Sequence, residues 1–243
     1  GPTLNAARRC PIFVDRFRGI GGAKDGVGAR AALERACERG LESACSNLGR
    51  LCDQGIGGPV DRDRAMELQQ GACSRGYTAA CARMGRLLEV GEGGLQDTIK
   101  ARAYYRSGCD KGDKRACALL AAACARGRGG PEDPTAARQW ADKACRLGSG
   151  LGCWLLGDLW EDGKGGRKDE VKSRKSLEKA CALGFGIGCT NLGMAWEHGR
   201  GGAEDKTKAR DFYGKGCDLE HGRGCTYLGL LLHPDMPDLG VSK

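Results

Sequence analysis

The chain has 243 residues, of which 40% are hydrophobic, only 5% are aromatic and 42 are glycine. These proportions exclude a disordered chain and leave too little bulk for an ordinary large core. Small helices packed closely through Ala and Gly would satisfy both limits. The formal charge of +8 comes from 39 basic and 31 acidic residues that are largely intermixed. Intermixed charge is typical of solvated helix faces, so we expect no nucleic-acid surface.

No apolar run approaches the length of about 18 residues that a membrane-spanning helix needs. We therefore do not expect the chain to span a membrane. The opening Gly1-Pro2 resembles a remnant of protease cleavage, so the lack of a signal peptide in the sequence says little about export.

A unit of 36 residues repeats six times without gaps, and each copy begins with G-x-G-G. The predicted repeats are 19–54, 55–90, 91–126, 127–162, 163–198 and 199–234. Positions within a repeat are numbered below from the first glycine of this motif. Residues 235–243 are expected to form a C-terminal tail.

Residues 1–18 precede the first complete repeat. With a one-residue offset, the stretch CPIFVDRF matches the second helix of a repeat and sets Cys10, Phe13 and Phe17 on its cysteine, leucine and position-34 sites. We therefore expect residues 1–18 to hold the cleavage remnant and the second helix of a truncated preceding repeat.

Position 7 is aspartate in every repeat: Asp25, Asp61, Asp97, Asp133, Asp169 and Asp205. An aspartate between a glycine turn and a helical pattern predicts an N-cap, whose side-chain oxygen accepts from N–H groups of the first turn. Pro134 supports this interpretation, because the first helical position tolerates proline. A calcium loop is the alternative, since glycine-rich loops with acidic residues can bind that ion. We expect no metal and no cofactor.

We call the first helix of each repeat the A helix. It has small residues at positions 11 and 18, and most repeats have large residues at position 14 or 15, as in Tyr104-Tyr105. These spacings place the apolar residues on one helical face. A glycine such as Gly148 then predicts a left-handed helix end, although the sixth repeat has Glu220 there. The second helix, the B helix, carries Leu-Gly or a variant, which suggests close approach of a neighbouring helix.

One such hairpin cannot bury its apolar face alone. Stacked hairpins would complete the core, so the sequence predicts an all-α protein with the architecture of an α/α solenoid.

Two cysteines stand eight positions apart in each repeat, the first in the last turn of the A helix and the second in the first turn of the B helix. An antiparallel hairpin brings these places together, which predicts six disulfides. The pairs are Cys37–Cys45, Cys73–Cys81, Cys109–Cys117, Cys145–Cys153, Cys181–Cys189 and Cys217–Cys225. Zinc or redox chemistry is the alternative, but each hairpin offers only two thiols and the histidines follow no repeat. Disulfides favour a secreted, periplasmic or surface-attached protein.

Cys52 and Cys124 share position 34, where other repeats have Leu or Trp. The position is interpreted as core, so both are expected to be buried free thiols that lie too far apart to form a bond.

The combined pattern of A-x-x-Y-Y, Cys, Gly, A-C, L-G, G-x-G-G and Asp resembles the Sel-1-like repeat, and the cysteine pairing is similar to that of the cysteine-rich Hcp-type proteins. The match covers residues 19–234 and is clear in ARDFYGKGCDLEHGRGCTYLGLLL at 209–232. The resemblance implies a right-handed solenoid whose concave groove, lined mainly by A helices, holds a protein or peptide. Related repeats in an assembly factor of the mitochondrial intermembrane space make that compartment an alternative.

Position 12 of the A helix is arginine in five repeats: Arg30, Arg102, Arg138, Arg174 and Arg210. Stacking would align these side chains into a basic ladder that could grip carboxylates of an acidic protein segment. A row of solvated or internally paired guanidinium groups is the alternative. Tyr104, Trp140 and Phe212 could serve as neighbouring aromatic anchors.

The predicted function is a non-enzymatic scaffold for protein–protein interaction. Its alternative is an enzyme: some Hcp-type proteins are described as penicillin-binding or as weak β-lactam hydrolases, and residues 176–179 form an S-x-x-K motif with Ser176 and Lys179. Neither S-D-N nor K-T-G occurs in the chain. Ser176 also falls in the middle of a predicted helix, which favours a chance match.

Overall fold

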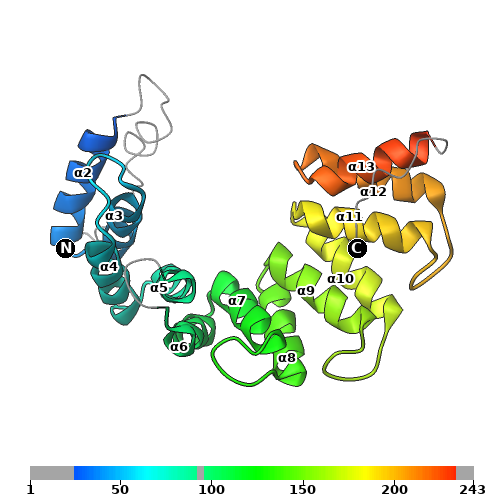
Figure 1. Cartoon of the computed structure of the whole chain (residues 1–243), viewed down its shortest axis with the longest axis horizontal. Helices are drawn as coiled ribbons and strands as arrows, with labels where there is room; N and C mark the ends of the chain where they lie inside the picture. Colours follow the sequence, from blue (N-terminus) through cyan, green and yellow to red (C-terminus); the bar gives the residue numbers. More distant parts are fainter. Residues whose placement is uncertain (1–24, 92–95, 234–243) are drawn as a thin grey trace, which may run out of the picture. The chain divides into compact units, whose positions relative to one another are not determined.

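The computed structural model describes residues 25–91 and 96–233. Within these ranges the secondary structure is twelve α-helices without a β-strand, which confirms the predicted all-α class (Figure 1). The helices are α2 (Gly26–Glu38), α3 (Glu42–Gln54), α4 (Arg62–Ser74), α5 (Thr78–Val90), α6 (Thr98–Asp110), α7 (Lys114–Ala125), α8 (Pro134–Arg146), α9 (Gly150–Glu161), α10 (Glu170–Ala182), α11 (Gly186–Glu197), α12 (Lys206–Asp218) and α13 (Gly222–Leu232).

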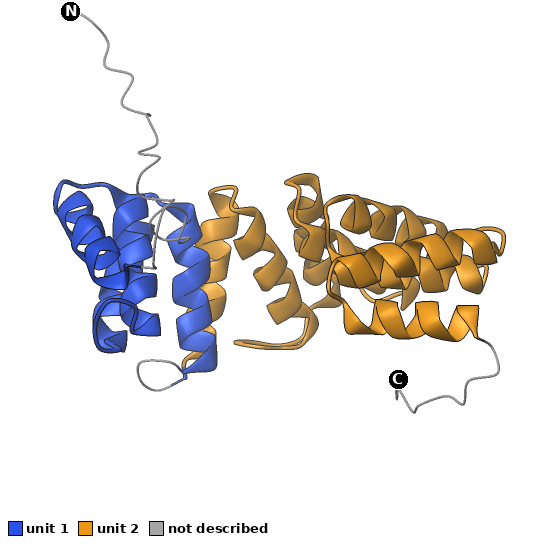
Figure 2. Ribbon diagram, turned by 90° about the horizontal axis from the view of Figure 1, so that it is seen from above, with its two compact units in different colours: residues 1–96 blue, residues 97–243 orange. Residues whose placement is uncertain are grey.

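The even-numbered helices are the A helices, and the odd-numbered helices are the B helices. The chain divides into two compact units, residues 1–96 with α2–α5 and residues 97–243 with α6–α13 (Figure 2). In each unit a B helix packs against its own A helix and against the A helix of the next hairpin, as α9 does with α8 and α10. Within each unit, consecutive hairpins therefore stack as the repeat pattern predicted.

Each A helix begins as the aspartate column predicted. All six aspartates accept a hydrogen bond from the backbone N–H three residues later, at 2.8–3.0 Å. At α8 the bond runs from the Ala136 N–H to Asp133, and Pro134 occupies the first turn. The N-cap interpretation is confirmed.

The hairpin turns end in a left-handed residue. Gly148 has φ 81° and its N–H donates to the carbonyl of Cys145 at 3.0 Å. Glu220 takes the same conformation, with φ 59° and an N–H that donates to Cys217 at 2.9 Å. Because a side chain in this region is strained, the sixth turn keeps its geometry at a cost that glycine avoids.

The core is built from small residues that let the helices approach closely. Ala65, Ala101, Ala137 and Ala209 at position 11 are fully or almost fully buried. A Cβ atom at Gly157 of α9 would lie 3.1 Å from the Leu177 side chain of α10. Mid-helix glycine costs about 1 kcal/mol relative to alanine. The close approach of the next A helix explains why the B helices accept that cost.

Positions 14 and 15 separate in the structure, although the sequence placed both on one apolar face. Position 15 is buried, as Tyr105 and Tyr213 show, whereas Tyr104 at position 14 is only half-buried. The expected helix in residues 1–18 and the expected tail at 235–243 lie outside the described residues. The six repeat boundaries remain a prediction.

Candidate functional site

All six predicted cysteine pairs are disulfides. They join Cys37–Cys45, Cys73–Cys81, Cys109–Cys117, Cys145–Cys153, Cys181–Cys189 and Cys217–Cys225, with Cα–Cα distances of 4.4–4.8 Å. Each bond connects the end of an A helix to the start of its B helix. These disulfides indicate an oxidising, extracytoplasmic environment.

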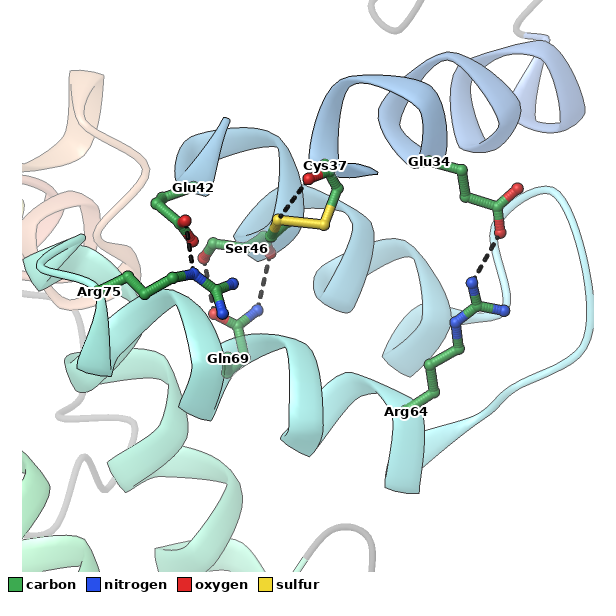
Figure 3. The surroundings of a disulfide bond; sticks show 8 residues. Glu34, Cys37, Glu42, Ser46, Arg64, Gln69 and Arg75 are labelled. Carbon is green, nitrogen blue, oxygen red and sulfur yellow. Dashed lines mark hydrogen bonds and ion pairs between the residues drawn. A yellow bond between two sulfur atoms is a disulfide. The ribbon is translucent and has the colours of Figure 1, made fainter. Parts of the chain in front are cut away.

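Polar contacts around the first disulfide connect two hairpins of unit 1 (Figure 3). The Gln69 side chain of α4 donates to the Ser46 carbonyl at 2.7 Å and accepts from the Ser46 hydroxyl at 2.6 Å. Both residues are buried. The Arg83 guanidinium donates to the same hydroxyl at 2.6 Å. Since buried polar groups are costly unless paired, this network fixes the register of the two hairpins.

Cys52 and Cys124 are free and fully buried, as predicted. Each thiol faces an arginine from position 12 of its own repeat. Arg30 Nη2 lies 3.4 Å from Cys52 Sγ, and Arg102 Nη2 lies 3.2 Å from Cys124 Sγ. Burial raises the pKa of the Cys52 thiol, and the nearby Arg30 charge opposes that rise.

Tryptophan replaces cysteine opposite the next two arginines. The Arg138 guanidinium carbon lies 4.0 Å from the Trp160 ring centroid, and that of Arg174 lies 4.1 Å from the Trp196 ring centroid. Arg174 also donates to the backbone carbonyls of Arg200 at 2.7 Å and Ala195 at 2.8 Å. Its exposed fraction is only 6%.

The basic ladder is therefore mainly an internal feature. Four of its members, Arg30, Arg102, Arg138 and Arg174, bind the loop that follows their own hairpin and opens the next repeat. Each side chain reaches backbone carbonyls of a turn that begins more than 20 residues later. Arg210 differs, since its side chain is half-exposed and lies 3.8 Å from Asp211. The internally paired alternative describes the four, and Arg210 alone stays available to a partner.

The interpretation of position 34 as core needs a correction. Cys52 and Leu88 are buried, but Trp160 and Trp196 are half-buried and Leu232 is exposed. The sequence did contain a signal for the Arg–Trp and Arg–Cys pairs. In this chain Cys or Trp at position 34 always accompanies Arg at position 12, whereas Met66 accompanies Leu88.

A cavity of about 390 Å³ lies beside one of these tryptophans. Its lining residues are Trp160, Arg167, Lys168, Asp169 and Lys172. Lys168 pairs with Glu170 at 2.8 Å and Lys172 with Asp169 at 3.2 Å. Both lysines of the lining therefore already have an acidic partner within the chain.

The predicted aromatic anchors lie at position 14 of unit 2. Tyr104 of α6, Trp140 of α8 and Phe212 of α12 are all half-buried. Cations surround Trp140, with Arg106 5.7 Å and Lys143 5.4 Å from its ring centroid.

A lysine follows position 14 by three residues in three consecutive repeats. These are Lys143, Lys179 and Lys215, and Lys215 lies 4.9 Å from the Phe212 ring centroid. Residues three apart are neighbours on a helix surface. The A helices of unit 2 thus present aromatic rings beside a row of amines, a feature that sequence reasoning missed although the lysine column was visible.

Ser176 occupies the same position 14 in α10. Its hydroxyl is buried and donates to the Lys172 carbonyl at 2.8 Å, one turn earlier in the helix. A serine bonded in this way to its own backbone is typical of a helix interior. The structure gives the S-x-x-K motif no arrangement that favours a nucleophile.

Among the residues with described positions, no group of three or more His, Cys, Asp or Glu residues could hold a metal ion. No helix in that part of the chain combines the length and apolarity needed to cross a lipid bilayer.

Comparison with known families agrees with the helical hairpins and their spacing. The Sel1 repeat family model matches residues 42–77, 78–113, 114–149, 150–185 and 186–221. The chain belongs to the Sel1 repeat family. Each match keeps the 36-residue period and begins at a B helix. The family model therefore places the boundary between repeats at the start of the B helix, whereas the sequence analysis placed it at G-x-G-G. Sel1 repeat proteins are typically scaffolds for protein–protein interaction.

Solved structures contain similar Sel1 repeat folds. A protective antigen present in uropathogenic Escherichia coli strains is 27% identical with a TM-score of 0.75; the match covers 93% of this chain and 48% of that protein. The present chain thus spans about half the length of that relative. A Sel1 repeat protein from Oxalobacter formigenes is 19% identical with a TM-score of 0.78, over 96% of this chain and 90% of that one.

Helicobacter pylori cysteine rich protein B is 32% identical over 55% of this chain and 96% of its own length, with a TM-score of 0.46. A search of curated proteins found no match.

Proposed function

We propose that this Sel1 repeat protein binds an acidic segment of a partner protein across the A helices of unit 2. The observation that carries the proposal is the half-buried Trp140, which has Arg106 and Lys143 within 6 Å of its ring. An aromatic side chain that keeps part of its surface in water offers a partner apolar area at low entropic cost. The amines beside it offer charge-assisted hydrogen bonds to carboxylates.

Charge complementarity supports an acidic partner. Lys143, Lys179 and Lys215 recur at one position, and Arg106 of α6 and Arg210 of α12 add two guanidinium groups. A row of like charges on adjacent helices speeds association with an oppositely charged segment. The family resemblance implies that A helices line a concave groove, which is where we propose that the segment lies. A periplasmic or secreted setting is the compartment we propose.

Affinity capture from an extracytoplasmic fraction, followed by titration of the purified partner, tests the proposal. Replacing Lys143, Lys179 and Lys215 with Gln should weaken binding and flatten its dependence on salt, since screening acts only on charges that remain. Each amine that loses a desolvated carboxylate costs about 1.5–3 kcal/mol, and a contact at the rim costs less than about 1 kcal/mol.

The control removes the same number of charges elsewhere in unit 2. Arg115, Arg167 and Arg223 are exposed, and their replacement with Gln should leave the affinity unchanged. Equal binding by both triple variants would refute the proposal. Trp140→Ala separates the aromatic contribution, because it should weaken binding without altering the salt dependence.

A further inference from the structure

The cavity beside Trp160 lies where the end of α9, the loop after it and the first turn of α10 meet. Its volume of about 390 Å³ falls within the range of about 300–1,000 Å³ that is typical of sites for small organic molecules. All of its lining residues belong to unit 2. Arg167, Lys168 and Lys172 of the lining are cationic, and Asp169 is acidic. The lining therefore carries net positive charge and favours an anionic occupant.

The ion pairs of the two lysines leave most of their hydrogen-bonding capacity free. Lys168 contacts Glu170 at 2.8 Å and Lys172 contacts Asp169 at 3.2 Å, and more than half of each lysine side chain is exposed. An ammonium group has three donors, and an exposed pair contributes at most about 1 kcal/mol. A ligand can therefore bind both amines without a large loss. Arg167 is exposed and has no carboxylate partner in the described part of the chain.

The positive charge of the cavity comes from side chains, because the N-terminus of α10 is already capped. The Asp169 carboxylate accepts from the Lys172 N–H at 2.9 Å. This bond, together with the Lys172 ammonium group, holds the pKa of Asp169 below its ordinary value. Asp169 thus serves the helix cap, and the contacts available to a ligand come from the three cationic side chains.

Other repeats of the chain show that the fold does not require these cations. Positions 5 and 6 are Arg167 and Lys168 in this loop, Pro-Glu at 131–132 and Ala-Glu at 203–204. The last of these loops follows Trp196, which also packs against an arginine and a lysine. Two cations before the capping aspartate are therefore a local departure from the repeat that the folding of the loop does not explain.

Trp160 supplies the apolar wall of the cavity. Its ring is half-buried, with the Arg138 guanidinium carbon 4.0 Å and the Lys172 amine 4.4 Å from its centroid. The two cations hold the ring in place at the edge of the cavity. The part of the indole that reaches solvent there is available to an apolar or aromatic group of a ligand.

We propose that this cavity binds an organic phosphate monoester, with its phosphoryl group on Arg167, Lys168 and Lys172 and its organic group against Trp160. A phosphate monoester carries a charge of about −1.5 to −2 at neutral pH and three terminal oxygens, which match three separate cationic groups. A carboxylate has one charge and two oxygens, so it matches them less well. The site shares no residue with the A-helix face of the proposed function and does not depend on it.

Calorimetric titration of the whole chain with phenyl phosphate tests the proposal. The buffer contains no phosphate and has low ionic strength, because salt screens exposed charges. Phenyl phosphate should bind saturably. Inorganic phosphate and benzoate should each bind at least about tenfold more weakly, because the first lacks the ring and the second lacks the third oxygen and the higher charge.

The decisive variant takes its residues from the next loop of the same chain. Arg167→Ala with Lys168→Glu reproduces positions 203–204, so the loop should fold, and phenyl phosphate should bind at least about tenfold more weakly. Lys175→Glu with Arg115→Ala is the matched control. It changes the net charge by the same amount, and both residues are exposed outside the cavity lining. The control should bind phenyl phosphate as the unsubstituted chain does.

Trp160→Leu separates the ring from the charges, and Leu88 shows that another repeat accepts leucine at this position. This variant should weaken the binding of phenyl phosphate and leave that of inorganic phosphate unchanged. Melting curves measured by circular dichroism confirm that each variant is folded. An unchanged affinity for phenyl phosphate in the folded Trp160→Leu variant would overturn the contact between the ligand and the ring.

Three other results would overturn the proposal. Equal loss of binding in both double variants would show general attraction to the charge of the chain and not a site. Absence of saturable binding up to about 10 mM phenyl phosphate, or full binding by the loop variant, would refute the cavity as the site. Benzoate that binds as tightly as phenyl phosphate would refute the phosphate class. Because the lysine variants of the proposed function leave this cavity intact, the two proposals fail independently.

Discussion

Arg138 holds its guanidinium carbon 4.0 Å from the ring centroid of Trp160, although 21 residues separate them in the chain. The same guanidinium donates to the Leu159 carbonyl at 2.9 Å. Arginine thus connects the A helix to the end of the B helix and to the loop that follows. Equivalent contacts of Arg30, Arg102 and Arg174 close three more hairpins at the end opposite the disulfide.

The first prediction is that Arg138→Ala lowers the free energy of unfolding by about 1–3 kcal/mol, because the Leu159 carbonyl loses a charged donor in a partly buried bond and Trp160 loses one of its two cations. Arg138→Lys should recover only part of this, since an ammonium group cannot span several carbonyls as a guanidinium does. Arg210→Ala is the control and should change stability by less than about 0.5 kcal/mol. Denaturant unfolding measures all three. Equal effects at Arg138 and Arg210 would contradict the closing role.

The second prediction concerns which cysteines are free thiols and which are disulfide-bonded. Alkylation under denaturing, non-reducing conditions should modify Cys52 and Cys124 and leave the twelve cysteines of the six disulfides unmodified. Peptide mass spectrometry identifies each site. Under native conditions the thiols of Cys52 and Cys124 should react slowly, because they are fully buried. Alkylation of any paired cysteine would contradict the assignment of the disulfides.

A third prediction follows from the short loops that the disulfides close. Each bond restricts the unfolded state of one hairpin, worth about 2.5 kcal/mol in the chain-entropy description. Reduction should therefore lower the melting temperature and broaden the transition, because only contacts between neighbouring repeats remain to couple the hairpins. Calorimetry with and without reductant measures this, with mass spectrometry to confirm complete reduction. An unchanged transition would mean that packing alone holds the repeats.

The fourth prediction concerns pH. Burial raises the pKa of Asp158, and the neighbouring Asp162 and Glu161 raise it further. The folded chain therefore holds this proton more tightly than the unfolded chain, so stability from Asp158 is greatest at low pH and is lost as pH rises through the folded-state pKa. Asp158→Asn should raise the melting temperature at neutral pH by about 2–4 °C for each kcal/mol recovered.

The gain from Asp158→Asn should shrink below about pH 4, where the carboxyl is protonated in the unfolded chain as well. Glu67→Gln, at an exposed position of α4, is the control and should show no such pH dependence. A gain that stays constant between pH 3 and pH 8, within about 1 °C, would exclude the titration of Asp158 as its cause.

The sequence alone determined the features that depend on neighbours along the chain. Asp133 caps α8 by accepting from the N–H three residues later, and Cys145 bonds to Cys153, eight residues later, across a single turn. Such contacts recur with the repeat, so six copies made the hairpins, their caps, their disulfides and the stacked helical class predictable.

Tertiary structure decided which surfaces face water and which arginines form hydrogen bonds within the fold. The helical period placed Arg138 beside the apolar face but could not show that the end of α9 and the loop after it return over this side chain 21–29 residues later. It also could not separate Tyr104 from Tyr105, because one helical step of about 100° carries one ring to the surface and the other into the core. The physical reason is that exposure at the edge of an apolar stripe depends on the neighbouring hairpin, whose packing the local pattern does not specify.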